Sequence, residues 1–179
     1  MLKLVPYREH ESNDTFEIPA SDGTTLFIRR WKNMEGGVRR GTALLVHGLG
    51  EHSGRYGHVA HVLNEAGFDV WAHDHRGFGK SDGARARIPD RKTLIEDTKL
   101  VFGEMMKREG DPKPLLLGHS MGGAIAARAV TGGWIAPRAL ILSSPGLRSY
   151  ISAPMRALTR SLELLLPNLA VPHGLPLHT

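Results

Sequence analysis

The sequence predicts an α/β fold built on a mostly parallel sheet that opens with an antiparallel hairpin. Short apolar runs alternate with stretches of helical periodicity along most of the 179 residues. The runs at 42–46, 68–72 and 115–117 are almost wholly apolar, which is typical of strands covered on both faces. A Gly-x-Ser-x-Gly string stands where one of these strands meets a helix. These three observations predict the fold class, and the elements follow in order.

The first two elements are strands, and the later ones alternate between strand and helix. Residues 15–18 and 25–31 flank an Asp-Gly turn, which predicts a hairpin. Further strands are expected at 42–46, 68–72, 115–117 and 139–142, and helices at 56–66, 90–109 and 120–130. Such alternation implies parallel strands joined by right-handed crossovers.

The regular rhythm ends near residue 145. One amphipathic helix with leucines at 158, 162, 165 and 166 is expected next, and the prolines at 167, 172 and 176 end regular structure. We therefore expect residues 1–148 to form the core and residues 149–179 to begin a lid or cap.

Composition excludes several kinds of protein. Hydrophobic residues make up 41% and charged residues 23%, which are ordinary values for a globular domain. The sequence contains no run of eighteen apolar residues, so it predicts no membrane span, and its N-terminus carries no signal-peptide pattern. The absence of cysteine excludes disulfides, thiolate metal sites and a cysteine nucleophile. We expect a cytoplasmic protein, with peripheral attachment to a membrane as the open alternative.

The net charge of +5 is concentrated near the end of the chain. Residues 121–179 hold five arginines, no lysine and a single acidic residue, Glu163, so they carry +4 of it. The arginines form no run and few aromatic residues lie among them, so a nucleic-acid partner is not expected. The arginines either form a solvated face or would be balanced by acidic residues in a further part of the protein that this chain lacks.

The string Gly118-His119-Ser120-Met121-Gly122 predicts a nucleophilic serine. A sharp strand-to-helix turn would expose the Ser120 hydroxyl above the sheet, and Gly118 and Gly122 would leave room for strand and helix to approach. The helix N-terminus would favour the negative charge that develops on a reacting carbonyl oxygen. The alternative interpretation of Ser120 is a simple helix cap.

A loop earlier in the sequence is expected to provide part of the oxyanion hole beside that serine. His47-Gly48-Leu49-Gly50 follows the strand that ends at Val46. In this architecture the oxyanion hole takes one amide from that loop and one from the residue after the nucleophile, which assigns the amides of Leu49 and Met121. His47 is expected to fix the loop rather than act as the base, because the base follows the nucleophile in this chain order.

Three strings together resemble a known family. Residues 47–56 read HGLGEHSGRY, residues 74–81 read DHRGFGKS and residues 118–123 read GHSMGG. They resemble the monoacylglycerol lipase and lysophospholipase branch of the α/β-hydrolases, with a domain of the serine aminopeptidase S33 type. The resemblance runs from about residue 16 to residue 145. It implies the α/β-hydrolase fold and a carboxylic ester hydrolase.

The resemblance also implies roles for individual side chains. Glu51 and Arg55 would position the polar alcohol group of the substrate. The alternative is an ion pair that only orders the loop. Asp74 and Arg76 would tie loops together, and Asp74 precedes the nucleophile and is therefore not the expected triad acid.

The acid and base of a catalytic triad cannot be assigned. The order in this fold is serine, carboxylate, histidine, and the chain after Ser120 offers only Glu163, His173 and His178. Glu163 falls on the expected lid helix, and both histidines fall in the proline-rich tail with no strand directly before them. We expect a fold that is incomplete at its C-terminus. The chain would be a truncated product, an intact short protein with a substitute base such as His173, or a non-catalytic relative. Missing strands would leave an unpaired sheet edge and an uncovered apolar face.

These observations predict hydrolysis of a lipid ester, either a monoacylglycerol or a lysophospholipid, through an acyl-enzyme on Ser120. A broad carboxylesterase, a peptidase of the same fold and a non-catalytic binding module remain as alternatives. No metal and no organic cofactor is implied. Residues 151–166 would form a lid that contacts lipid, or one that packs only on the protein. Acyl-chain preference and oligomeric state are left open.

Overall fold

The structure is a computed structural model that describes residues 11–33, 38–88, 90, 92–147, 152, 154 and 161. Contacts divide the chain into two units, Met1–Gly146 and Leu147–Thr179, and every element described below lies in the first. The leucines of the expected lid helix lie outside the described residues, as do Glu163, His173 and His178. The expected division between residues 148 and 149 stays a prediction.

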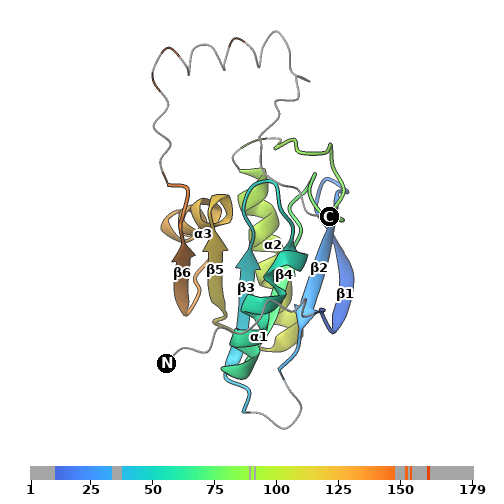
Figure 1. Cartoon of the computed structure of the whole chain (residues 1–179), viewed down its shortest axis with the longest axis vertical. Coiled ribbons are helices and arrows are strands. Elements are labelled where there is room, and N and C mark those ends of the chain that lie inside the picture. The colour runs from blue at the N-terminus through green and yellow to red at the C-terminus, as the bar shows by residue number, and fades with distance from the viewer. Residues whose placement is uncertain are drawn as a thin grey trace. The chain divides into compact units, whose positions relative to one another are not determined.

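Strands and helices alternate as the sequence predicts (Figure 1). The strands are β1 (Asp14–Pro19), β2 (Thr25–Trp31), β3 (Gly41–Val46), β4 (Phe68–His73), β5 (Leu115–His119) and β6 (Ala139–Ser143). The helices are α1 (Gly57–Glu65), α2 (Thr93–Glu109) and α3 (Met121–Thr131), and a short 3-10 turn, η1 (Ser53–Tyr56), precedes α1.

One sheet contains all six strands, in the order β1-β2-β4-β3-β5-β6. The pairs β1–β2 and β2–β4 are antiparallel, whereas β4–β3, β3–β5 and β5–β6 are parallel. The predicted mostly parallel sheet with an N-terminal hairpin is therefore confirmed. The hairpin extends the same sheet through the contact of β2 with β4.

The register of the parallel strands places the loops that follow them at one edge of the sheet. Val46, the last residue of β3, pairs with His73, the last residue of β4, and with Gly118 near the end of β5. Loops at the carboxyl ends of adjacent parallel strands meet above the sheet, which is where such folds place their sites. The loop after β3, the loop after β4 and the turn after β5 are therefore neighbours.

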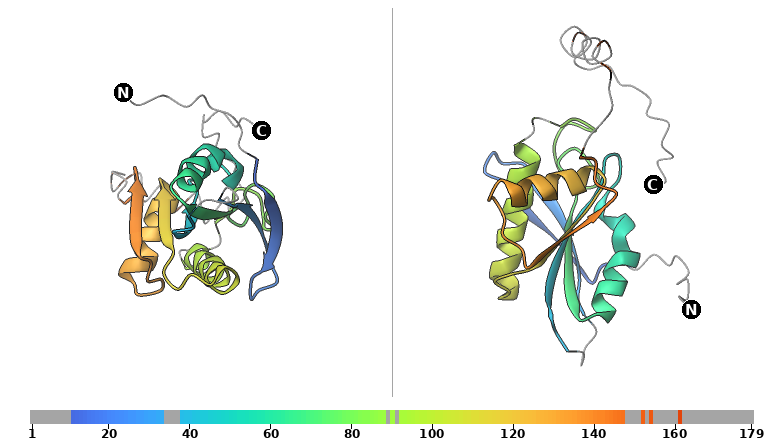
Figure 2. Two further views of the ribbon diagram at one scale, coloured as in Figure 1. Left: turned by 90° about the horizontal axis from the view of Figure 1, so that it is seen from below. Right: turned by 90° about the vertical axis from the view of Figure 1, so that its left-hand side faces the viewer.

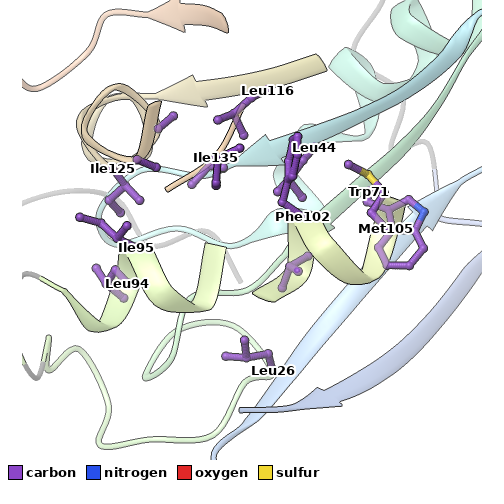
Figure 3. Close-up of a cluster of buried hydrophobic side chains, with 14 of the residues drawn as sticks. Leu26, Leu44, Trp71, Leu94, Ile95, Phe102, Met105, Leu116, Ile125 and Ile135 are labelled. Carbon is purple, nitrogen blue, oxygen red and sulfur yellow. The ribbon is translucent and has the colours of Figure 1, made fainter. Parts of the chain in front are cut away.

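Helices cover both faces of the sheet, with α1 on one face and α2 and α3 on the other (Figure 2). Alternate residues of β3 serve the two faces, as the pleat requires. Leu44 and Val46 belong to the core cluster that includes side chains of α2 and α3, and Leu45 belongs to the cluster under α1. In the larger cluster, Leu44, Leu116 and Phe102 lie between sheet and helices (Figure 3). The continuous apolar runs in the sequence are explained by this burial on both sides.

Two details differ from the sequence-based expectation. Helix α2 begins at Thr93 rather than at Asp90. The carboxylate of Asp90 accepts hydrogen bonds from the amides of Lys92 (2.6 Å) and Thr93 (3.0 Å), so this residue stands before the helix and satisfies its first donors. The turn η1 was not expected, because a four-residue segment carries no detectable periodicity.

Strand β6 forms one edge of the sheet among the described residues. Its side chains are largely exposed, with Ile141 at 42% and Leu142 at 37%. The expected unpaired edge with apolar side chains is present in the described part of the chain. Within the same residues, no helix is long and apolar enough to cross a membrane.

Candidate active site

Ser120 occupies the turn between β5 and α3 in a conformation that L-residues seldom adopt. Its backbone angles are φ 50° and ψ −117°. Neighbouring backbone holds it there, because its amide donates to the Ser143 carbonyl (3.0 Å) and its carbonyl accepts from the Gly146 amide (2.9 Å). A strained residue persists only where its surroundings determine it, and such residues concentrate at functional sites.

The two glycines around Ser120 are needed for close packing. A β-carbon on Gly122 would collide with the carbonyl oxygens of Val46 and His47. A β-carbon on Gly118 would collide with the backbone of Gly122. Any side chain at either position would therefore push α3 away from β3 and β5 and displace the serine between them.

The loop after β3 passes directly beside the serine. A β-carbon built on Gly48 would lie 3.2 Å from Cβ of Ser120. His47 is 1% exposed, its Nδ1 is 2.7 Å from the Gly48 carbonyl oxygen, and its Nε2 accepts the His75 amide at 2.9 Å. Because Nε2 accepts, Nδ1 carries the proton and donates it to the Gly48 carbonyl. These contacts suit a histidine that fixes the loop.

The amides assigned to the oxyanion hole come from different elements. Met121 is the first residue of α3, whose first-turn amides have no partner within the helix. The side chain of Leu49 is 54% exposed, so it stands at the surface of the loop. No described residue accepts a hydrogen bond from the Leu49 amide.

The side chain of Glu51 forms hydrogen bonds within its own loop. Its Oε1 accepts hydrogen bonds from the Gly48 amide (2.6 Å) and from the Tyr56 hydroxyl (2.7 Å). Its Oε2 lies 4.0 Å from Nε of Arg55, which is a loose contact, and the Arg55 side chain is 45% exposed. One carboxylate oxygen is thus engaged by the loop, and the other faces a half-exposed guanidinium.

Tyr56 is a residue of this site that the sequence analysis did not single out. It ends η1 and is 7% exposed, and its ring centroid lies 6.4 Å from that of His119, the residue before Ser120. Burial and the hydrogen bond to Glu51 raise the pKa of the Tyr56 hydroxyl, so it stays protonated. Its place at the end of the string HGLGEHSGRY was the available signal.

Three buried histidines lie beneath the loops after β3 and β4. The rings of His47 and His75 are 4.1 Å apart between centroids, and those of His73 and His75 are 4.9 Å apart. Desolvation lowers the pKa of His47 and of His73 to about 3, and it lowers the pKa of His75 well below 6.5. All three are therefore neutral at physiological pH, and burial removes them from contact with substrate.

Asp74 and Arg76 tie loops together, as expected. The carboxylate of Asp74 accepts the amides of Ser53 (2.7 Å) and Lys80 (2.7 Å), which joins the loop after β3 to the loop after β4. Arg76 makes two hydrogen bonds of 2.7 Å to Asp97 on α2, and a third of 2.6 Å to Asp22 in the hairpin turn.

The described residues after the nucleophile contain no acid or histidine, because residues 121–147 include no Asp, Glu or His. The histidine next to Ser120, His119, is half-buried, and its Nδ1 lies 3.1 Å from the Ser143 hydroxyl. Within the described ranges, no group of three His, Asp or Glu side chains could hold a metal ion.

The chain is similar in sequence to proteins that are named as lipases. The chain is 35% identical to the monoglyceride lipase of Mus musculus over 173 residues, which is 93% of this chain and 54% of that protein. It is 37% identical to the monoacylglycerol lipase of Mycolicibacterium smegmatis over 136 residues, 74% of this chain and 48% of the relative. The chain thus spans about half the length of the curated relatives it matches.

A solved structure and a family description give the same result. The crystal structure of Paleococcus ferrophilus monoacylglycerol lipase superposes with a TM-score of 0.66 at 35% identity, covering 84% of this chain and 55% of that one. The family described as serine aminopeptidase, S33, matches residues 37–179. With its mostly parallel sheet, its strained serine at the strand-to-helix turn and this match over most of its length, the chain belongs to the serine aminopeptidase S33 family of α/β-hydrolases.

Proposed function

We propose that this chain carries the nucleophile and the oxyanion hole of a serine hydrolase that cleaves carboxylic esters of lipids. The observation that supports this most strongly is the conformation of Ser120 (φ 50°, ψ −117°) at the start of α3, beside the Gly48 backbone. A strained serine at a strand-to-helix turn is the arrangement that exposes a nucleophilic hydroxyl. The relatives named as monoglyceride and monoacylglycerol lipases support a monoacylglycerol as the substrate, and the resemblance of the sequence motifs keeps a lysophospholipid as the other candidate.

In the proposed reaction, the Ser120 oxygen attacks the ester carbonyl while its proton passes to a base. The carbonyl oxygen becomes an oxyanion that the amides of Leu49 and Met121 bind. The C–O bond to the alcohol then breaks, the alcohol takes a proton, and an acyl-enzyme remains on Ser120. Water attacks this ester in turn and releases the fatty acid.

Glu51 and Arg55 would position the alcohol group of the substrate. The Oε2 atom of Glu51 and the half-exposed guanidinium of Arg55 lie 4.0 Å apart, so both have hydrogen-bonding capacity left for a hydroxyl. The proposal further divides the chain into a core of residues 1–148 and a lid that begins at residue 149. We also propose a cytoplasmic location and a contact with lipid through residues 151–166.

Fluorophosphonate labelling of the 179-residue chain, read by intact mass, tests the proposal. We expect one adduct on the wild type and none on Ser120→Ala, because the reagent phosphonylates only an activated serine. His173→Gln and His178→Gln would then identify the base. Hydrolysis of p-nitrophenyl acyl esters compared with aminoacyl anilides separates esterase from peptidase activity.

A non-catalytic role is the second candidate, because residues 121–147 contain no acid or histidine that could complete a triad. A folded wild-type chain, judged by circular dichroism, that takes no fluorophosphonate would reject the hydrolase proposal for this chain. It would favour a binding role for the same scaffold.

A further inference from the structure

We propose that Tyr56 is a positioning residue for the oxyanion loop, because its hydroxyl holds the Glu51 carboxylate that in turn holds the Gly48 amide. The inference rests on the proposed function and deepens it. It assigns Oε1 of Glu51 to the protein's own backbone and leaves only Oε2 for a substrate.

A single carboxylate oxygen joins the tyrosine to the loop. The Tyr56 hydroxyl donates to Oε1 of Glu51 at 2.7 Å, and the Gly48 amide donates to the same atom at 2.6 Å. Hydrogen bonds to an ionised acceptor are about twice as strong as those between neutral groups. The carboxylate therefore fixes the orientation of the peptide between His47 and Gly48.

The next peptide of the loop is fixed from the other side. The Nδ1–H of His47 donates to the Gly48 carbonyl at 2.7 Å. In a trans peptide the carbonyl and the following N–H point in opposite directions, so the Leu49 amide points away from His47. No acceptor for this amide exists among the described residues. The loop is thus held on two sides, and the Leu49 amide is left available to bind an oxyanion.

The position of Gly48 makes this hold relevant to the nucleophile. A β-carbon on Gly48 would lie 2.6 Å from Oε1 of Glu51 and 3.2 Å from Cβ of Ser120. The backbone that the carboxylate holds is therefore in van der Waals range of the serine. A displacement of Glu51 would move the loop relative to the attacking oxygen, and oxyanion-hole donors act over a narrow range of distance.

The surroundings of Tyr56 fix the side chain in a place from which it can hold Glu51. It is 7% exposed, it ends η1 and precedes α1, and its ring lies beside His119 at 6.4 Å between centroids. The same side chain therefore contacts the acidic residue of the loop and approaches the residue next to the nucleophile. Phenylalanine at this position would keep the packing and remove only the hydrogen bond.

Amide hydrogen exchange of the full chain, followed by NMR at Gly48, tests the inference without requiring activity. We expect Tyr56→Phe to speed exchange at Gly48 about five- to tenfold and Glu51→Ala to speed it more, because each loses a hydrogen bond. Glu51→Gln keeps an oxygen acceptor but loses the charge, so its Gly48 exchange rate should lie between those of the wild type and Glu51→Ala. The amide of Leu45 in β3 serves as the internal reference and should not change.

Two results would overturn the inference: an unchanged Gly48 exchange rate in Tyr56→Phe, or an equal rise at Leu45, which would indicate general destabilisation. If the wild type takes fluorophosphonate, Tyr56→Phe should also lower the maximal labelling rate at an unchanged half-saturating concentration, and an unchanged rate would equally contradict it. If the wild type takes none, the proposed function fails for this chain, while the exchange rates still decide the role of Tyr56.

Discussion

Ser120 stores backbone strain at the point where chemistry is proposed. Its φ of 50° combined with ψ of −117° suits glycine, because a β-carbon crowds the neighbouring peptide in this region. Such a residue costs on the order of 1–3 kcal/mol, and the hydrogen bonds to Ser143 and Gly146 help to offset that cost. Stability and the proposed activity therefore oppose each other at this residue.

Replacing this serine separates the two effects. Ser120→Gly should raise the free energy of unfolding by about 1 kcal/mol, because glycine adopts the same angles without strain. Ser120→Ala keeps the β-carbon and should change stability little. Urea unfolding of both variants checks this, and equal stabilities would show that the strain is not expressed in the folded chain.

At the scale of elements, α3 packs against the sheet more closely than α2 does. A β-carbon on Gly122 of α3 would collide with backbone oxygens of β3 and the residue after it, whereas one on Gly103 of α2 would meet no atom within 4 Å. The missing side chain of Gly122 thus allows α3 to pack closely on the sheet, whereas the missing side chain of Gly103 only weakens α2.

Alanine at these two glycines should have opposite effects. Gly122→Ala should lower the free energy of unfolding by about 1–3 kcal/mol, because the backbone has to shift. Gly103→Ala should raise it by about 1 kcal/mol, because alanine is the better helix former. Denaturant midpoints measure both, and a loss of stability in Gly103→Ala would contradict the packing described for α2.

Arg76 connects three elements through buried charge. Its side chain is 8% exposed and that of Asp97 is 3% exposed. Removing one member of such a pair leaves the other buried without a partner. Arg76→Met should therefore cost about 3–5 kcal/mol, and the double variant Arg76→Met, Asp97→Leu should recover much of the loss. A double variant no more stable than the single one in thermal melts would show that the pair is not coupled.

At the scale of the whole molecule, the three buried histidines make stability depend on pH. The folded protein keeps His47 and His73 neutral down to about pH 3, and His75 neutral well below pH 6.5. An unfolded chain protonates its histidines below about pH 6.5. Unfolding therefore takes up protons in this range, and the free energy of unfolding falls as the pH falls.

The expected slope is about 1.4 kcal/mol per pH unit for each of His47 and His73, between about pH 6 and pH 4.5, and His75 contributes in the same direction. His73 has no hydrogen-bond partner for either ring nitrogen among the described residues, so His73→Leu should lower the slope by about 1.4 kcal/mol per pH unit without breaking a hydrogen bond. Urea titrations at several pH values measure the slope. An unchanged slope in the variant would mean that His73 does not contribute to the pH dependence of the free energy of unfolding.

Local patterns predicted the strands, the helices and Ser120, because each depends on residues close in sequence. The end of β4 shows what they could not predict. His73 and His75 read as polar loop residues, yet His73 ends β4 in register with Val46 of β3, and both side chains are fully buried. Glu51 and Tyr56 are five residues apart, but their hydrogen bond depends on η1, which has no sequence signature. The structure confirms the turn at which Ser120 lies, whereas the catalytic role of Ser120 and the roles of Leu49, Met121, Glu51 and Arg55 stay predictions.

The two edges of the sheet differ in how they would receive another strand. Strand β1 carries Asp14, Glu17 and Pro19, and charge and proline discourage strand addition. Strand β6 consists of Ala139-Leu140-Ile141-Leu142-Ser143, which has neither. Among the described strands, the edge at β6 therefore favours the addition of a further strand, whereas the edge at β1 disfavours it.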